Sequence, residues 1–298
     1  MIFDFGAKTM QPTPADRSLE AGRSLVVFMM LDLAKAAPPR LIEHRLGVTD
    51  FENKPHELVP PALAVSDQSA IVVAPPLRGE WIAGDSVHNT PDAAHRRAIA
   101  VEGGRPWLAQ RYAIDWVQFK TVDGVRTTWT GPQDRNESYF CYDQPIHSVA
   151  AGKVVGTLDG LAENVPHSGK FAFPLDFINA AGNHVVVEIA PERYVLYAHM
   201  RPGSVRVKVG DTVATGDVLG HVGNTGSSSE PHLRMHIDDH PSFLGGNGVP
   251  YEFTEFSASG PVEVIVKPGS QVISFGPIGE QKPFTRDYPA TNALVTFK

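Results

Sequence analysis

Residues 182–200 read GNHVVVEIAPERYVLYAHM, and this stretch carries the pattern that decides the fold class. It holds two runs rich in Val, Ile and Tyr, NHVVVEIA (183–190) and RYVLYAHM (193–200), and these residue types favour strands. Similar runs, separated by turns that contain glycine, lie on both sides of it: RYAIDWVQF (111–119), HSVAAGKVVGTL (147–158) and VLGHVGNTG (218–226). No convincing helical period interrupts them, so the predicted fold class is mainly β.

Length and composition describe an ordinary globular protein. The 298 residues suffice for one large or two modest domains, and 42% of them are hydrophobic and 20% charged. The formal net charge is -7 and no long basic run is present, so we expect no nucleic-acid partner. The single cysteine, Cys141, excludes an intramolecular disulfide and a zinc site built from cysteines.

The longest apolar run, LVVFMML (25–31), is too short to span a bilayer, which takes about 20 residues. Acidic residues precede it (Asp4, Asp16 and Glu20), and no clear small-residue cleavage site follows, so the run is a poor signal peptide. We therefore expect no membrane span, and no signal peptide is visible.

The strand patterns divide the chain into four segments. Residues 1–23 are expected to be a loosely structured leader, and residues 24–80 an N-terminal β module resembling a β-sandwich. Residues 90–258 hold the main run of strands, and residues 259–298 are expected to add C-terminal strands that pack on this body.

Residues 231–237 read PHLRMHI, and their alternation predicts a strand with two different faces. His232, Arg234 and His236 share one face, while the apolar residues between them face the core. Two histidines on one face suggest a metal or proton-transfer site. The cationic arginine between them suggests the opposite.

Four stretches of the chain occur in an order and spacing that together carry a resemblance. They are GKVVGTLDG (152–160), GNHVVVEIAPERYVLYAHM (182–200), VRVKVGDTVATGDVLGHVGNTGSSS (205–229) and EPHLRMHI (230–237). Over roughly residues 105–258 the chain resembles the lysostaphin-type, LytM-like zinc endopeptidases, bacterial cell-wall hydrolases that cut peptide cross-links. The resemblance implies an antiparallel β-sheet groove domain, and a cell envelope or periplasmic location.

The family's site implies a role for five positions of this chain. Asp115 matches the aspartate that ligates zinc, but the histidine ligand expected four residues earlier falls on Arg111. The remaining histidine ligand falls on Arg234. His199 and His232 match the two histidines that transfer protons or stabilise the tetrahedral intermediate in the family.

Arginine cannot ligate zinc, because it stays protonated and offers no lone pair. Arg111 is expected on the same strand and face as Asp115, with Arg234 across the groove. Our hypothesis is that one or both guanidiniums occupy the zinc position and pair with Asp115. Two other histidines are secondary candidates: His95, which precedes the site strand and can fold back over it, and His236, about 13 Å along the strand from His232 and suited to a neighbouring site.

Two function classes follow, and a third is remote. The arginines favour a degenerate peptidase domain without a cofactor, which binds a peptide, a peptidoglycan fragment or a protein partner in its groove. The alternative is an active zinc metalloendopeptidase with a non-standard metal site. The pattern of the run VGDTVATGDVLG (209–220) also occurs in biotinyl and lipoyl carrier domains, which present a modifiable lysine on a hairpin tip. Here Lys153 and Lys208 both lie in or beside predicted strands, so a carrier domain is the remote alternative.

Overall fold

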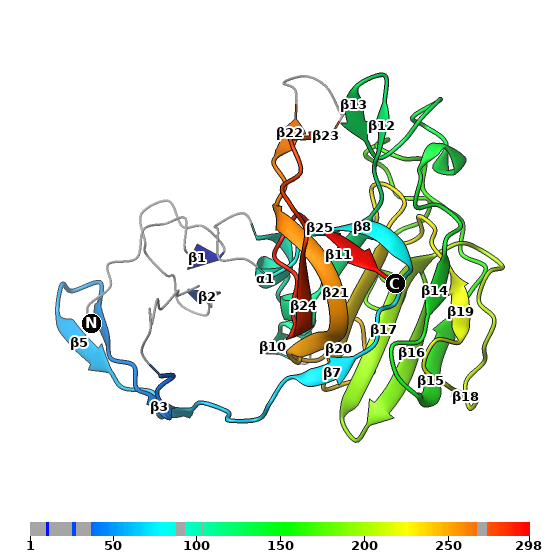
Figure 1. Ribbon diagram of the computed structural model, residues 1–298. Coiled ribbons are helices and arrows are strands. Elements are labelled where there is room, and N and C mark those ends of the chain that lie inside the picture. Colours follow the sequence, from blue (N-terminus) through cyan, green and yellow to red (C-terminus); the bar gives the residue numbers. More distant parts are fainter. Residues whose placement is uncertain (1–9, 12–25, 28–36, 88–92, 103, 267–272) are drawn as a thin grey trace. The chain divides into compact units, whose positions relative to one another are not determined.

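The computed structural model describes residues 10–11, 26–27, 37–87, 93–102, 104–266 and 273–298 (Figure 1). The chain divides into two compact units, residues 1–69 and 70–298. Most of the predicted leader, residues 1–23, lies outside the described residues. No helix in the described part of the chain is long and apolar enough to cross a membrane.

In its described residues, the first unit consists of short antiparallel strand pairs. The pairs are β1 (Met10–Gln11) with β2 (Val26–Val27), β3 (Leu41–Ile42) with β6 (Leu63–Ala64), and β4 (Leu46–Thr49) with β5 (Pro55–Leu58). Every residue of β4 and β5 is exposed, so these strands do not show the sandwich-like packing predicted for residues 24–80. Strands of two to four residues present too little apolar area to hold a second sheet.

The second unit is built on one sheet of eleven strands (Figure 1). All neighbouring strands are antiparallel except β7 and β21, which pair in parallel. In spatial order the strands are β18 (Thr212–Val213), β15 (Gly152–Leu158), β16 (Asn183–Ala190), β17 (Arg193–Met200), β20 (Leu233–Asp238), β11 (Ile114–Val117), β8 (Gly79–Gly84), β25 (Ala293–Phe297), β21 (Tyr251–Pro261) and β24 (Lys282–Asp287), with β7 (Ile71–Val73) also beside β21.

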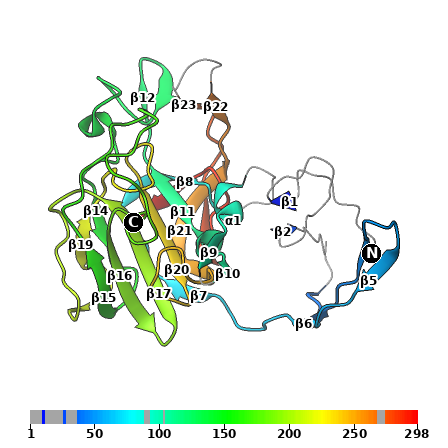
Figure 2. The same cartoon turned by 180° about the vertical axis from the view of Figure 1, so that it is seen from behind.

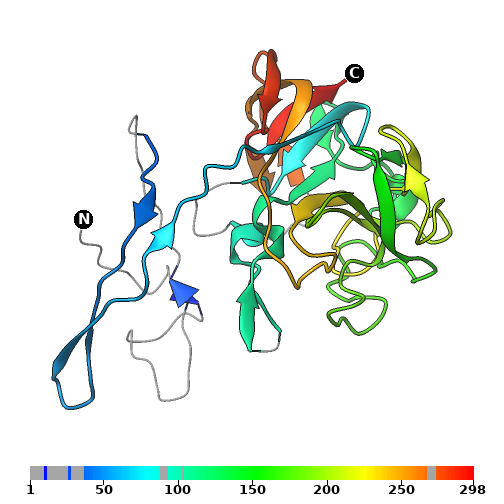
Figure 3. The same cartoon turned by 90° about the horizontal axis from the view of Figure 1, so that it is seen from below.

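Smaller elements surround this sheet. Three further sheets are formed by β12 (Lys120–Val122), β13 (Val125–Thr127), β23 (Ile273–Phe275) and β22 (Val264–Val266), by β14 (Pro145–His147) and β19 (Val218–His221), and by β9 (Ala100–Glu102) and β10 (Arg105–Trp107). The helical segments are α1 (Ala94–Arg97), η2 (Ala109–Tyr112) and η3 (Asn136–Ser138). Figure 2 shows α1 beside β11, and Figure 3 shows the β9–β10 hairpin projecting from the sheet.

The second unit begins earlier in the chain than the sequence pattern predicted. Residues 24–80 were expected to form the N-terminal module, but β7 (Ile71–Val73) hydrogen-bonds along β21, and β8, which begins at Gly79, lies between β11 and β25. The sheet therefore takes strands from both ends of the unit. The C-terminal strands β24 and β25 belong to the same sheet, which explains how they pack against the rest of the unit.

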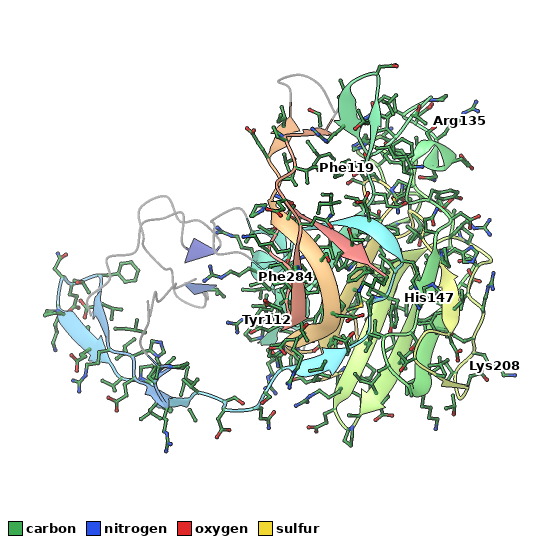
Figure 4. The ribbon with its side chains drawn as sticks, in the orientation of Figure 1. Tyr112, Phe119, Arg135, His147, Lys208 and Phe284 are labelled. Atoms are coloured by element: carbon green, nitrogen blue, oxygen red, sulfur yellow. The ribbon has the colours of Figure 1, made fainter. Side chains whose placement is uncertain are left out.

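The largest hydrophobic cluster lies on one face of the large sheet and follows from the alternation of its strands. A smaller cluster, which includes Val186, Leu196 and Phe243, lies on the other face. Leu233, Met235 and Ile237 of β20 are all fully buried, as their positions in PHLRMHI predict. Aromatic rings extend this core toward the opposite edge, where Phe284 of β24 stacks on Phe256 of β21 with 5.3 Å between ring centroids (Figure 4). The side chains between the apolar ones on β20 turn to the other face, and this face carries the candidate site.

Candidate functional site

Asp115 and Arg234 form the centre of the site. They are direct partners in the register between β11 and β20. The Arg234 guanidinium donates two hydrogen bonds to the carboxylate, from Nε to Oδ1 at 2.8 Å and from Nη2 to Oδ2 at 2.8 Å. Both side chains are largely buried, with 15% of Asp115 and 14% of Arg234 exposed. This is the bidentate geometry in which a guanidinium binds a carboxylate most strongly.

The charge on Asp115 is held by its neighbours. Burial alone raises the pKa of the Asp115 carboxyl, but the charges of Arg234 and of nearby histidines outweigh that effect. The pKa of Asp115 therefore lies well below its ordinary value, and the carboxylate is ionised at neutral pH. Both of its oxygens are occupied by N–H donors.

His232 and His199 lie next to this ion pair. His232 Nε2 is 3.6 Å from Asp115 Oδ1, and the rings of the two histidines are 4.7 Å apart. Each Nδ1 contacts a backbone carbonyl, that of Glu230 at 2.8 Å for His232 and that of Thr225 at 2.7 Å for His199. A carbonyl only accepts hydrogen bonds, so each Nδ1 carries the proton and each Nε2 keeps its lone pair.

The backbone of His199 is held in an unusual conformation. Its φ is 66°, in the left-handed region, which is uncommon for a residue other than glycine. The His199 N–H donates to the Ala181 carbonyl at 2.9 Å, and the His199 carbonyl accepts from Gly223 N–H at 3.1 Å. Such strain costs about 1–3 kcal/mol and persists only where the surroundings enforce it. The two hydrogen bonds aim the ring at His232.

Both histidines are uncharged at neutral pH. Burial lowers the pKa of His199 well below its ordinary value, and the neighbouring His232 and Arg234 lower it further. Burial also lowers the pKa of His232, although the negative charge of Asp115 opposes this effect. Neutral imidazoles with a free Nε2 act as hydrogen-bond acceptors. In the described residues, however, neither Nε2 has a hydrogen-bond partner.

The structure brings His95 into the same site. This histidine belongs to the short helix α1, which packs against η2, and only 4% of the residue is exposed. Its Nδ1 lies 2.9 Å from the carbonyl of Asp85 and 3.2 Å from that of Ala113. Its Nε2 lies 3.4 Å from Asp115 Oδ2. His95 and His232 thus face different oxygens of the Asp115 carboxylate.

The prediction that Arg111 shares the strand and the face of Asp115 is wrong. Arg111 belongs to the 3-10 helix η2, and strand β11 begins only at Ile114. The turn of this helix, closed by a hydrogen bond from Ala113 N–H to the Gln110 carbonyl at 3.0 Å, breaks the alternation of the strand. Arg111 is exposed, and its guanidinium lies over the ring of Tyr112, 5.5 Å from the centroid.

His236 shares a face with Arg234, but it lies away from the carboxylate. The residue is fully buried, with its ring 5.7 Å from that of Phe243 and its Nε2 4.0 Å from Asp238 Oδ2. Among the described residues, neither ring nitrogen of His236 has a hydrogen-bond partner. Burial lowers the pKa of His236 to about 3 and raises that of Asp238 to about 8. His236 and Asp238 thus form a second buried polar pair, whose histidine ring contacts Phe243.

A family match covers part of the site. Residues 140–244 match the model of peptidase family M23. The chain carries an M23 peptidase-family domain. The match includes His199, His232 and Arg234, whereas His95 and Asp115 precede the matched segment. Among curated protein sequences, none matches the chain.

Several solved structures are similar to this chain at low identity. The catalytic domain of the prophage-encoded M23 protein EnpA from Enterococcus faecalis is 19% identical, with 55% of this chain and 93% of that chain covered and a TM-score of 0.29. The catalytic domain of lysostaphin from Staphylococcus simulans is 21% identical, with 39% and 83% covered and a TM-score of 0.24. A chain from a SpoIIQ–SpoIIIAH complex is 16% identical, with 58% and 88% covered and a TM-score of 0.34.

The residues of this M23 domain do not fit the zinc ion that the family implies. Within the described residues, no three His, Cys, Asp or Glu side chains converge closely enough to hold a metal ion. Asp115 already binds the Arg234 guanidinium through both oxygens. The guanidinium is a cation without a lone pair, so it cannot replace a ligand.

The sequence pattern did not identify the groups that fix the histidine rings in the M23 domain. Two of them are the carbonyls of Thr225 and Glu230, and backbone groups leave no signal in side-chain identity. The Glu230 carboxylate has a further role, because its Oε2 lies 2.9 Å from His167 Nε2. This contact fixes the segment that leads into His232. The GNTG run at 223–226 marks the turn that carries Thr225.

Proposed function

We propose that this protein is a degenerate M23 domain, which binds a peptide, a peptidoglycan fragment or a protein partner at the face around Asp115 without cleaving it. The observation that carries the proposal is the bidentate ion pair between Asp115 and Arg234. A hydrolytic zinc ion needs the carboxylate as a ligand and an open position for water. Here the carboxylate is neutralised by a cation of the protein itself.

The strength of this ion pair argues against metal binding in the native protein. Breaking a buried ion pair by removing one partner costs about 3–5 kcal/mol, since the remaining charge is left uncompensated. A metal that displaced Arg234 would also leave a guanidinium close to a dication. The cost alone corresponds to a loss of roughly 100-fold or more in metal affinity, at 1.36 kcal/mol per factor of ten.

The two retained histidines suit the recognition of a peptide. His199 and His232 are neutral, and each Nε2 keeps a buried lone pair that a peptide N–H would reach only after local opening of the site. Peptide N–H groups are donors that such acceptors bind. By family resemblance, we place the protein in the bacterial cell envelope or periplasm, where peptide cross-links and their fragments are found.

The test combines metal content, cleavage and binding. Zinc-treated native protein is dialysed, assayed for zinc, and incubated with purified peptidoglycan, whose release of soluble peptide is measured. We expect no stoichiometric zinc and no release, together with co-sedimentation of the protein with insoluble peptidoglycan or saturable binding of soluble cell-wall peptides. His199→Ala and His232→Ala should weaken this binding. His147→Ala is the control, because His147 belongs to β14, outside the large sheet (Figure 4).

One observation favours the second candidate, an active zinc metalloendopeptidase with a non-standard site. His95 Nε2 lies 3.4 Å from Asp115 and offers a ligand that the family pattern lacks. About one zinc ion per native chain, lost in Asp115→Ala, together with release of peptide from peptidoglycan, would establish this candidate and overturn the degenerate one.

A further inference from the structure

The smaller hydrophobic cluster lies on the same face of the large sheet as the candidate site. In the register between β17 and β20, Leu196 is the direct partner of His236, and Ala198 is that of Arg234. Directly opposed residues point to one face of a sheet, so these apolar side chains lie beside the polar ones. Val186 of β16 is the partner of Leu196 and extends the row. Val186, Leu196 and Ala198 therefore form an apolar floor next to the ion pair.

Phe243 covers this floor. The residue belongs to the same hydrophobic cluster, and only 5% of it is exposed. Its ring centroid is 5.7 Å from that of His236 and 6.2 Å from that of His199, which it meets edge to face at 83°. One side chain thus covers both the apolar floor and two of the imidazoles on this face.

Phe243 is carried by a loop rather than by a strand of the sheet. The loop, residues 239–248, is closed at a neck where Asp239 N–H donates to the Asn247 carbonyl at 3.1 Å. The Asp239 carboxylate also accepts two hydrogen bonds from Asn247, from the backbone N–H at 2.7 Å and from the side-chain amide at 3.2 Å. Compact loops with joined ends are frequently functional, and few hydrogen bonds have to break for them to open.

The closed loop leaves buried polar atoms unpaired beneath Phe243. His199 and His236 are fully buried, and His199 Nε2 and both ring nitrogens of His236 find no hydrogen-bond partner among the described residues. The same holds for Asp238 Oδ2 within that part of the chain. Polar groups buried in this way cost free energy, and a phenyl ring offers them no N–H or C=O group. A peptide backbone supplies both groups, so it complements this surface better than Phe243 does.

We infer that Phe243 occupies a ligand subsite, and that loop 239–248 opens so that an apolar side chain of a bound peptide replaces the ring. The inference rests on the proposed function and narrows its ligand to a segment of a protein partner with a side chain the size of phenylalanine. The present occupant carries this assignment, because a phenyl ring already fills the apolar floor. The backbone beside the replacing side chain brings its N–H and C=O groups to the unpaired atoms of His199 and His236.

The experiment measures by calorimetry the affinity for a capped peptide, Ala-Ala-Phe-Ala-Ala, and for its all-alanine counterpart. The native protein should bind the phenylalanine peptide more tightly. Phe243→Ala should bind it about 10–100-fold more tightly than the native protein does, since no buried ring has to be displaced. Phe243→Leu keeps an apolar side chain in the subsite and should stay close to the native affinity. Phe284→Ala, which removes a ring from the edge strand β24, is the matched control and should not change the affinity.

Asp239→Ala guards against a failure of Phe243→Ala to fold. It keeps the ring but removes both carboxylate contacts to Asn247, so the loop opens more often and the phenylalanine peptide should again bind more tightly. Circular dichroism checks that each variant is folded. In the native protein, the saturating phenylalanine peptide should accelerate amide hydrogen exchange within residues 239–248, whereas a ligand that leaves the loop closed would not.

The outcomes separate this inference from the proposed function. Folded Phe243→Ala and Asp239→Ala proteins without increased affinity, or unaccelerated exchange in the loop, overturn the subsite. Equal affinities for the two peptides, both weakened by His232→Ala, overturn the subsite and leave the proposed function standing. Tighter binding of soluble cell-wall peptides than of the phenylalanine peptide overturns the assignment to a protein partner. Zinc-dependent release of peptide from peptidoglycan by the native protein overturns the proposed function alone, provided that the loop still opens for the phenylalanine peptide.

Discussion

Asp115 and Arg234 face each other across the junction of β11 and β20, so that the backbone register itself places the carboxylate beside the guanidinium. The backbones of the two residues are held by the pairing of the strands, and their side chains are held by the two hydrogen bonds between them. Such a pair acts as a single unit, and the removal of one member differs in kind from the removal of both.

Arg234→Ala is expected to lower the free energy of unfolding by about 3–5 kcal/mol, because it leaves the buried Asp115 carboxylate without a counter-charge. The double variant Asp115→Asn/Arg234→Met, which replaces the pair by uncharged groups, should recover much of this loss. Urea denaturation at neutral pH measures both. Arg111→Ala, at an exposed position, should change the free energy by less than about 0.5 kcal/mol. Equal losses in the single and double variants would contradict the account of a coupled pair.

Acid should abolish the contribution of Asp115 to the free energy of unfolding. Its pKa in the folded protein lies well below the ordinary value, whereas in the unfolded chain it is about 3.9. The folded state therefore favours the ionised form, and the stabilisation is complete above about pH 5, falls as the pH drops below the unfolded pKa, and is lost at the lower folded pKa. The difference in unfolding free energy between native protein and Asp115→Asn should shrink over this acid range. A constant difference between pH 7 and pH 2 would contradict the assignment.

Asp238 should have the opposite pH dependence. Burial raises its pKa to about 8, so the folded protein holds a proton that the unfolded chain releases near pH 4. Stability is then lost as the pH rises from about 4 to 8, by up to about 1.4 kcal/mol per pH unit, and levels off above pH 8. Asp238→Asn removes this dependence and should be more stable than the native protein at pH 8, with little difference near pH 4. Thermal unfolding over this pH range checks the trend.

Cys141 should be unreactive until the protein opens. Its thiol is fully buried and donates a hydrogen bond from Sγ to the Pro231 carbonyl at 2.9 Å. Burial raises the pKa of the thiol to about 12, which suppresses the reactive thiolate. A disulfide reagent at pH 8 should label native protein only at the rate of unfolding, and fully in urea. Because Pro231 precedes His232, rapid labelling of folded protein would show that the segment before His232 opens locally.

The fold was predictable where the apolar period is long and uninterrupted. The runs at 183–190 and 193–200 coincide with β16 and β17. The edge strand β24 was not predicted, since its residues KPFTRD contain a proline and little apolar alternation. Its hydrogen bonds to β21 form the strand, and such a contact between distant segments leaves no local pattern.

The part of the site that lies on two paired strands could be predicted from the sequence, and the parts that lie on helical segments could be predicted less well. The hypothesis that Arg234 lies across from Asp115 agrees with the register of β11 and β20, and depends only on strand pairing. The position of Arg111 was not predictable by the same rule, because a 3-10 turn ends the strand between Arg111 and Asp115. His95 entered only as a secondary candidate, since the docking of α1 on η2 is a tertiary contact.

The order of strands in the large sheet also sets the limits of any shortened form of this protein. The segment that matches the family, residues 140–244, contains β20 but neither β11 nor β8, and the closing strand β25 comes from the last residues of the chain. An excised 140–244 fragment would expose β20 as a bare sheet edge, inviting association with other chains. It would also carry Arg234 without the carboxylate that neutralises it. A fragment that contains the whole site must therefore be much longer than the segment that matches the family model.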